Sequence, residues 1–173
     1  MSGQIHLVLG GARSGKSRRA QELAAIHSTD VTYIATCATD RLDPEMVARI
    51  DSHRGNRPAH WKTVENRFDL VDVIDRNGGT VFLLDCLTLW LAYWHGLKHS
   101  ESDILAILGR ALDHARQKAV SLLIVSNELG MGLVPEGEEN RAFRDLCGRA
   151  NQLVADFADH VEFVIAGLPL KLK

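Results

Sequence analysis

Short apolar runs alternate with longer segments of helical periodicity along the whole chain. Continuous apolar runs bounded by polar residues or glycine are typical of strands buried on both faces. We expect strands at 4–9, 31–35, 80–84, 120–126 and 161–166, with a weaker one at 61–64. We expect helices at 17–27, 44–54, 68–76, 87–97, 102–118 and 139–158. The alternation predicts an α/β fold with a mainly parallel sheet and helices on both faces.

Composition narrows the class of protein. With 173 residues, 46% of them hydrophobic, the chain is long enough for one domain over 1–173 with a real core. A net charge of −2 provides no basic field, so we expect no nucleic-acid partner. The apolar runs are too short for a signal peptide or a membrane span, so we expect no membrane insertion. Three widely spaced cysteines favour a cytoplasmic location and argue against a zinc site.

The most apolar segment, 87–97, contains Trp90, Tyr93 and Trp94. A core helix is one interpretation. An oligomer interface or a wall against a bulky ligand is the other, because large aromatic side chains gather at such surfaces.

A complete phosphate-loop motif, G-x-x-x-x-G-K-S, stands between the first expected strand and helix. Its residues are Gly10, Gly11, Ala12, Arg13, Ser14, Gly15, Lys16 and Ser17. In this context the backbone N–H groups cradle phosphates at a helix N-terminus, the lysine charge faces the β- and γ-phosphates, and the serine hydroxyl binds Mg²⁺. A glycine-rich turn that binds nothing is the alternative, and the position of the motif between a strand and a helix argues against it. The motif predicts binding of a nucleoside triphosphate, GTP or ATP.

Polar residues follow three of the expected strands. Asp85 is placed to hold Mg²⁺ directly or through water, although it could instead cap the helix at 87–97. Thr36-Cys37-Ala38 could line the nucleotide site or form a plain turn. Asn127 and Glu128 lie on a glycine-flanked loop, where Glu128 could act as a general base, support a metal ligand or be purely structural. We treat Asn127 and Glu128 as candidate substrate contacts.

The segment 43–58 carries a histidine among arginines. Asp43-Pro44-Glu45 begins the expected helix, and Arg49, His53, Arg54 and Arg57 gather toward its end. Cations at a helix C-terminus are often only solvated partners of the helix dipole. In a chain that binds a triphosphate, they also form a plausible phosphoryl or nucleotidyl acceptor site.

Motifs spread over nearly the whole chain resemble one known family. They are the loop at 10–17, Tyr33-Ile-Ala-Thr36, Arg49-Ile50-x-x-His53-Arg54, Arg57-Pro58, Trp61, Val125-Ser-Asn-Glu128, Gly130-Met131-Gly132, Pro135-Glu136, Phe143-Arg-Asp145, Gly148-Arg-x-Asn151-Gln152 and Gly167-Leu-Pro-Leu-Lys171. Together they resemble the bifunctional adenosylcobinamide kinase/adenosylcobinamide-phosphate guanylyltransferases of cobalamin (vitamin B12) biosynthesis. The Arg-Ile-x-x-His-Arg and Asn-Glu-x-Gly-x-Gly blocks are the specific ones.

The resemblance implies two reactions on a corrinoid substrate. A nucleoside triphosphate phosphorylates adenosylcobinamide, and GMP from GTP then passes through a guanylylated histidine to give adenosylcobinamide-GDP. The histidine is His53, with Lys16 as the second catalytic residue and Mg²⁺ held by Ser17 and Asp85. The implied nucleotide contacts are residues 10–17, Thr36, Cys37, Ala38, Arg54, Gly55, Asn56, Arg57, Glu65 and Asp85. A ring-like homo-oligomer, such as a trimer, is also implied, with the active site near a subunit boundary.

Two positions depart from the family pattern. Ser52 stands where some members carry a second histidine, and Asp85 where some carry glutamate. A plain phosphate-loop kinase would need Lys16 and Asp85 but not His53. A nucleotide-gated binding protein would modify nothing, and the absence of the N-K-x-D guanine motif counts against a standard GTPase switch. Covalently trapped nucleotide separates these possibilities.

Overall fold

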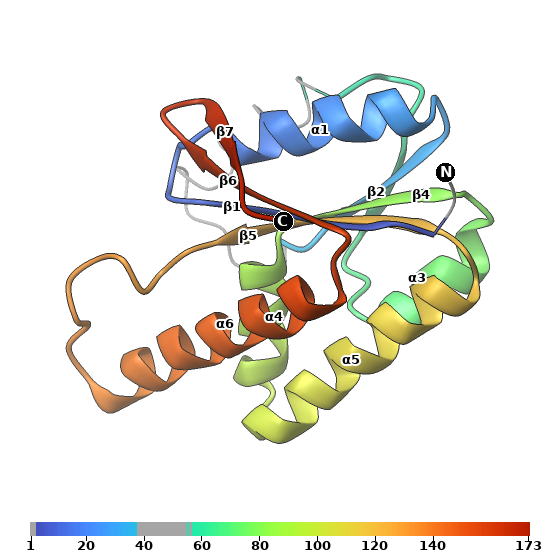
Figure 1. Cartoon of the computed structure of the whole chain (residues 1–173). Helices are drawn as coiled ribbons and strands as arrows, with labels where there is room; N and C mark the ends of the chain where they lie inside the picture. The colour runs from blue at the N-terminus through green and yellow to red at the C-terminus, as the bar shows by residue number, and fades with distance from the viewer. Residues whose placement is uncertain (1–2, 38–54, 56) are drawn as a thin grey trace.

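The strands assemble into one sheet in the computed structural model of the chain, which describes residues 3–37, 55 and 57–173 (Figure 1). They are β1 (Ile5–Gly10), β2 (Val31–Ala35), β3 (Lys62–Glu65), β4 (Val81–Asp85), β5 (Ser121–Asn127), β6 (His160–Ile165) and β7 (Leu168–Lys171). Their order is β3-β2-β4-β5-β1-β6-β7. All pairings are parallel except that of β6 with the edge strand β7. The prediction of a mainly parallel sheet is confirmed.

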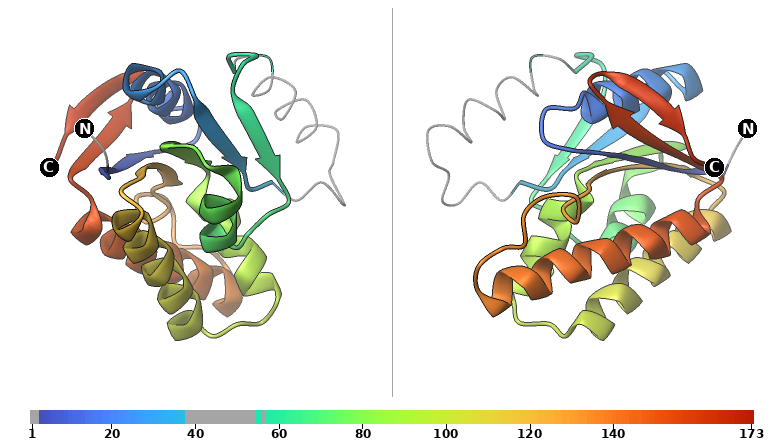
Figure 2. Two further views of the ribbon diagram at one scale, coloured as in Figure 1. Left: turned by 90° about the vertical axis from the view of Figure 1, so that its right-hand side faces the viewer. Right: turned by 60° about the vertical axis from the view of Figure 1, so that its left-hand side comes forward.

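Helices cover both faces of the sheet, as predicted, but unevenly within the described ranges (Figures 1 and 2). α1 (Lys16–His27) packs on one face against β1, β4 and β5. The opposite face carries α3 (Leu70–Asn77), α4 (Leu87–Gly96), α5 (Glu101–Gln117) and α6 (Glu138–Phe157). Side chains alternate along each strand, so Leu7 enters the core under α3–α6 while Val8 enters the core under α1.

Strand β1 lies in the interior of the sheet and positions the phosphate loop. All six of its residues are buried, between β5 on one side and β6 on the other. The carboxyl ends of β1, β4 and β5 therefore open at the same edge, where ligands of parallel α/β sheets bind.

The expected element bounds agree closely with the structure. Every predicted strand starts and ends within one residue of an observed strand, and the five predicted helices inside the described ranges do so within two. Helix α3 begins at Leu70 rather than 68 because the carboxylate of Asp69 accepts the backbone N–H groups of Val71 and Asp72 at 3.0 and 3.2 Å. The helix expected at 44–54 lies outside the described residues. The prediction missed β7.

The aromatic segment forms α4 and lies largely in the core. Trp90 is fully buried and donates its indole N–H to the carbonyl oxygen of Phe68 at 2.7 Å. Tyr93 stacks on the Phe68 ring at 3.6 Å and is 36% exposed, while Leu97 is 54% exposed. Only this end of the helix offers an apolar surface to a partner. No helix in the described part is long and apolar enough to cross a membrane.

Three histidines meet at the amino-terminal edge of the sheet, opposite the phosphate loop. The ring of His6 lies 5.1 Å from that of His27 and 4.5 Å from that of His160. Burial first, and then the two neighbouring imidazoles, lower the pKa of His6 to about 4, against the opposing effect of Asp159 and Glu162. His6 is therefore neutral in the folded protein at neutral pH.

We expect acid to destabilise the fold through His6. Between about pH 6.5 and pH 4 the unfolded chain binds a proton at His6 that the folded chain does not, so stability falls as the pH falls through this range. The expected loss is on the order of 3 kcal/mol. Urea unfolding of His6→Gln from pH 7.5 to 4 should show a flatter pH dependence than the unchanged chain, whereas His60→Gln, at an exposed position, should not. Equal slopes for His6→Gln and the unchanged chain would contradict this assignment.

Candidate nucleotide-binding site

The phosphate-loop motif folds as the tight connection between β1 and α1. Gly10 ends the strand, and the helix begins at Lys16. The loop closes on itself through a hydrogen bond from the backbone N–H of Ser14 to the carbonyl oxygen of Gly11 at 3.3 Å. The first turn of α1, with the positive end of its dipole, faces the loop, which is the arrangement that binds phosphate.

Two loop glycines are required by geometry. A Cβ on Gly10 would lie 2.4 Å from the Ser14 hydroxyl and 2.8 Å from the carbonyl oxygen of Val164. Gly15 has a φ of +96° and would bring a Cβ to 3.2 Å from the Cα of Gly167. The turn between β6 and β7 also holds the loop, because the N–H of Gly167 donates to the carbonyl oxygen of Ser14 at 2.8 Å. The loop thus depends on the C-terminal hairpin.

Lys16 and Ser17 lie side by side in sequence at the loop mouth, with different partners. The Lys16 ammonium donates to the carbonyl oxygen of Gly11 at 3.1 Å, which holds the charge over the loop. The Ser17 hydroxyl donates to Oδ1 of Asp85 at 3.3 Å, although the two residues are 68 positions apart. The structure therefore brings together the hydroxyl and the carboxylate that the sequence assigned to one metal ion.

Asp85 does not cap α4. The N-cap of that helix is Cys86, which makes no side-chain capping bond. The Asp85 carboxylate instead accepts the Ser17 hydroxyl at Oδ1 and the Tyr33 hydroxyl at Oδ2, the latter at 2.7 Å. The sequence left two roles open for Asp85, as a ligand of Mg²⁺ or as the cap of the helix at 87–97. The geometry agrees with the first role and not with the second.

Tyr33 joins Asp85 to Arg57. The tyrosine is 1% exposed, and the Arg57 guanidinium carbon lies 3.6 Å from the centre of its ring. Burial raises the pKa of Tyr33 strongly, and the Asp85 charge adds to the rise while Arg57 opposes it. The hydroxyl therefore stays protonated and acts as a donor. Sequence analysis placed Tyr33 in a motif but assigned it no role.

The residues after β2 have structural contacts. The Thr36 hydroxyl accepts the backbone N–H of Cys86 and donates to its carbonyl oxygen, both at 2.7 Å. This pair of bonds fixes the end of β2 to the junction between β4 and α4. Cys37, half-buried, follows at the site edge. Thr36 thus shapes the edge through its hydroxyl.

A buried polar network supports the end of β5. The Ser126 hydroxyl donates to the side-chain oxygen of Asn151 at 2.7 Å, and the Asn151 amide donates to the carbonyl oxygen of Asn127 at 3.2 Å. The backbone N–H and side-chain amide of Asn127 both donate to the Thr88 hydroxyl, at 3.0 and 3.3 Å. The candidate substrate contact Asn127 is therefore occupied by structural bonds. The sequence pattern gave no sign of this network.

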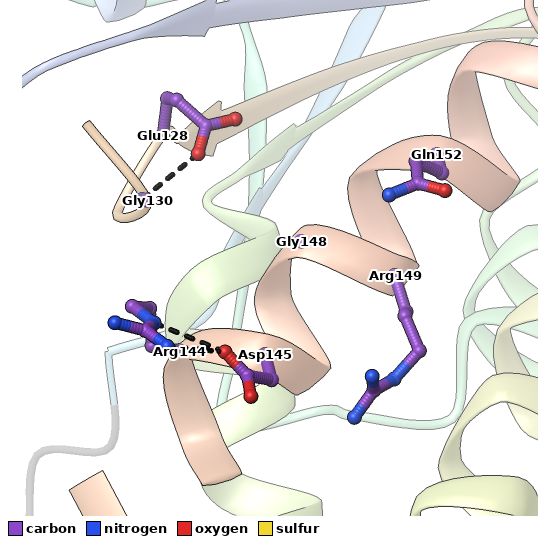
Figure 3. A pocket seen from close by; sticks show the side chains of 7 residues that line it. All are labelled: Glu128, Gly130, Arg144, Asp145, Gly148, Arg149 and Gln152. Atoms are coloured by element: carbon purple, nitrogen blue, oxygen red, sulfur yellow. Dashed lines mark hydrogen bonds and ion pairs between the residues drawn. The ribbon is translucent and has the colours of Figure 1, made fainter. Parts of the chain in front are cut away.

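Glu128 stands between the phosphate loop and a groove along α6. Its backbone N–H donates to the carbonyl oxygen of Gly10 at 3.3 Å, and its carboxylate accepts the N–H of Gly130 at 2.9 Å. Figure 3 shows this carboxylate beside a groove of about 240 Å³. The groove is lined by Glu128, Gly130, Arg144, Asp145, Gly148, Arg149 and Gln152.

Of the remaining candidate residues, only Gly55 and Glu65 lie among the described ones. Ala38, His53, Arg54 and Asn56 lie outside the described residues, and Gly55 is exposed. Glu65 ends β3, which is separated from β1 by β2, β4 and β5. At about 4.8 Å per strand, this places Glu65 roughly 19 Å across the sheet from β1. If Glu65 contacts the nucleotide, it therefore contacts a part of that molecule that is remote from the phosphates in the loop.

Strand β1, the phosphate loop, α1 and the acid at the end of β4, on the far side of β5, define a P-loop nucleotide-binding α/β protein. A family model described as cobinamide kinase / cobinamide phosphate guanyltransferase matches residues 6–172. The chain belongs to this family, which confirms the resemblance seen in its motifs and the enzyme class that it implied.

Curated relatives match this chain over nearly their whole length. The bifunctional adenosylcobalamin biosynthesis protein CobP of Pseudomonas aeruginosa is 40% identical over 177 residues, covering 96% of each chain. The proteins of that description named CobU in Escherichia coli and Salmonella typhimurium are 40% and 39% identical, each covering 96% of this chain and 98% of the relative.

A solved structure supports the fold alone. The flagellar accessory protein FlaH from Methanocaldococcus jannaschii matches with a TM-score of 0.56 at 15% identity, covering 99% of this chain and 79% of that one.

Proposed function

We propose that the chain carries out two consecutive transfers to adenosylcobinamide, first of a phosphoryl group and then of GMP. The single observation that carries the proposal is the complete phosphate loop with the Ser17 hydroxyl 3.3 Å from the strand-end carboxylate of Asp85. Family membership supplies the substrate class, a corrinoid.

In the first transfer, the hydroxyl of the aminopropanol arm attacks the γ-phosphorus of a bound triphosphate. A phosphorus–oxygen bond forms to the substrate, the bond to the β-phosphate oxygen breaks, and the hydroxyl proton is released. The loop N–H groups and the Lys16 ammonium stabilise the negative charge on the transferring and leaving oxygens. Glu128, beside the loop, is our candidate contact for the arriving substrate.

Mg²⁺ fits the residues at the loop mouth. A hydroxyl and a carboxylate oxygen are the hard ligands that this ion prefers, and Ser17 and Asp85 present one of each. When bound, the ion neutralises phosphate charge. Asp85, which stands where some family members carry glutamate, is still a carboxylate and so keeps this type of ligand.

In the second transfer, we assign the nucleophile to His53. Its neutral imidazole attacks the α-phosphorus of GTP, a phosphorus–nitrogen bond forms, and pyrophosphate leaves. A phosphate oxygen of the substrate then attacks the same phosphorus and releases the histidine, giving adenosylcobinamide-GDP. Arg54 and Arg57 would bind phosphate oxygens, with Thr36, Cys37, Ala38, Gly55, Asn56 and Glu65 contributing to the nucleotide pocket.

The cysteines are poor rivals for this nucleophile. Burial raises the pKa of Cys86 to about 11 and that of Cys147 to about 12, and it also raises the pKa of Cys37. None of the three is a thiolate to a useful extent near pH 7. All three are free thiols, which agrees with our placement of the enzyme in the cytoplasm.

We also propose a homo-oligomer, such as a trimer, with each active site near a subunit boundary. The exposed end of α4, including Leu97, is a candidate contact. Sedimentation at several protein concentrations measures the assembly directly, and a monomer at all of them would contradict this part of the proposal.

Radiolabelled GTP tests the proposed function. Label at the α-phosphate should remain covalently on the protein, whereas label at the γ-phosphate should not, since pyrophosphate leaves. Addition of phosphorylated adenosylcobinamide should discharge the α-label into product. A protein that phosphorylates adenosylcobinamide but never retains α-label would be a plain kinase.

We expect Asp85→Asn to raise the Mg²⁺ requirement. The amide keeps the shape of the side chain but removes the charge. The Mg²⁺ concentration for half-maximal GTP binding should therefore rise at least about tenfold. Calorimetric titration of GTP at several Mg²⁺ concentrations measures this. Asp113→Asn, at an exposed position on α5, is the matched control. An unchanged Mg²⁺ titration for Asp85→Asn would leave Asp85 with a structural role only.

A further inference from the structure

We propose that Tyr33 is a positioning residue for Asp85, and that the same side chain orders Arg57 at the nucleotide site. The inference rests on the proposed function, because it assigns Asp85 to the metal and Arg57 to phosphate. Tyr33 is not expected to touch the reacting atoms.

The sheet places Tyr33 within reach of Asp85. In the parallel pairing of β2 with β4, Tyr33 lies opposite Leu83 and Ala35 lies opposite Asp85. The strand partner of Tyr33 thus lies two residues before Asp85 on β4, which makes Tyr33 a diagonal neighbour of the aspartate. A long side chain spans that separation. Its hydroxyl meets Oδ2 at 2.7 Å.

Two donors from different elements fix the plane of the carboxylate. The terminal torsion of an aspartate is broad, so an unsupported carboxylate samples many orientations. Tyr33 on β2 holds Oδ2, and Ser17 on α1 meets Oδ1 at 3.3 Å. A carboxylate has about four lone-pair sites, so these two bonds alone do not exhaust its capacity as a metal ligand. Loss of one donor should therefore weaken metal binding without unfolding the site.

The ring face of Tyr33 serves a second charged group. The guanidinium carbon of Arg57 lies 3.6 Å from the ring centre, a close cation–π contact. Among the described residues, the Arg57 Nε is buried and has no hydrogen-bond partner. A guanidinium that contacts a ring face through its flat side keeps its in-plane N–H donors directed away from the ring, where an anionic ligand can accept them. In sequence, Arg57 follows the candidate nucleophile His53 by four positions.

Tyr33→Phe isolates the hydroxyl from the ring. Because a hydrogen bond to a charged group is lost, the Mg²⁺ concentration for half-maximal GTP binding should rise about tenfold. Binding is measured by calorimetry, so the result does not depend on turnover. Thr32→Val is the matched control, since it removes another buried hydroxyl from β2, one residue away, and should leave the Mg²⁺ requirement unchanged. A Tyr33→Phe protein that titrates like the unchanged chain would overturn the inference.

A double-mutant cycle separates positioning from general support of the fold. If Tyr33 acts through Asp85, Tyr33→Phe should add less than a twofold change when introduced into Asp85→Asn. If the effects of Tyr33→Phe and Asp85→Asn on the Mg²⁺ requirement multiply in full in the double variant, the inference is overturned, even if each single variant binds Mg²⁺ poorly. Thermal unfolding of all variants confirms that the comparison is made between folded proteins.

Tyr33→Leu tests the ring. This variant removes the hydroxyl and the cation–π contact together, so at saturating Mg²⁺ it should bind GTP several-fold more weakly than Tyr33→Phe. Equal affinities would overturn the Arg57 part. These are binding measurements, so the absence of a guanylylated protein would contradict the proposed transfer while leaving the assignment of Tyr33 standing.

Discussion

Replacing Lys16 with alanine should lower the rate of triphosphate-dependent phosphorylation by about 100-fold or more, because the variant loses a positive charge aimed at the transferring phosphate. In the structure, the Lys16 ammonium contacts the Gly11 carbonyl oxygen at the loop mouth rather than packing in the core. The fold should therefore survive, with an unchanged circular dichroism spectrum. Phosphorylation of adenosylcobinamide under saturating GTP or ATP measures the effect.

Lys118→Ala is the matched control for this experiment. Lys118 is also exposed and paired, here with Asp75 at 2.8 Å, but it precedes β5 at the opposite end of the sheet. Its removal should leave the rate within twofold of the unchanged chain. Near-normal turnover by folded Lys16→Ala protein would mean that this loop is not the kinase site.

The His53→Ala protein should retain no α-label from GTP and make no adenosylcobinamide-GDP. It should still phosphorylate adenosylcobinamide at a measurable rate, because phosphoryl transfer in a phosphate loop uses no nucleophilic histidine. The label on the unchanged protein should be lost in acid and kept in base, as a phosphoramidate is. Mass spectrometry of the labelled peptide locates the modified residue.

His60→Ala provides the comparison, since it removes another imidazole seven positions later, at an exposed site. It should label normally. Undiminished label on His53→Ala would move the nucleophile to another residue, and loss of both activities in that variant would mean that the two transfers share His53.

The fold was predictable where local pattern and topology agree. Continuous apolar strands, helical periodicity and the phosphate-loop motif gave the bounds of most elements to within two residues. Strand β7 was missed because it has only four residues and contains Pro169, which counts against a strand in the sequence. The structure places that proline at the sheet edge, opposite Val164, where the missing N–H costs no ladder bond.

The site was predictable only in part, because contacts between elements depend on strand order. The motif identified Lys16 and Ser17, and strand-end logic identified Asp85. That Tyr33 reaches Asp85 follows from β2 lying beside β4, which no periodicity encodes. The Ser126–Asn151 bond similarly joins β5 to α6. Whether His53 and its neighbours approach the loop remains a prediction from motif and family.

The interior position of β1 has a consequence for synthesis on the ribosome. This apolar strand precedes its partners β5 and β6 in the chain, and the N–H of Ile5 bonds to Asp159 across 154 positions. Until β5 has been made, the strand has no native neighbour and must be sheltered from aggregation. The phosphate loop also needs the Gly167 bond from the turn between β6 and β7. GTP can therefore stabilise the fold through this loop only after the C-terminal hairpin has formed.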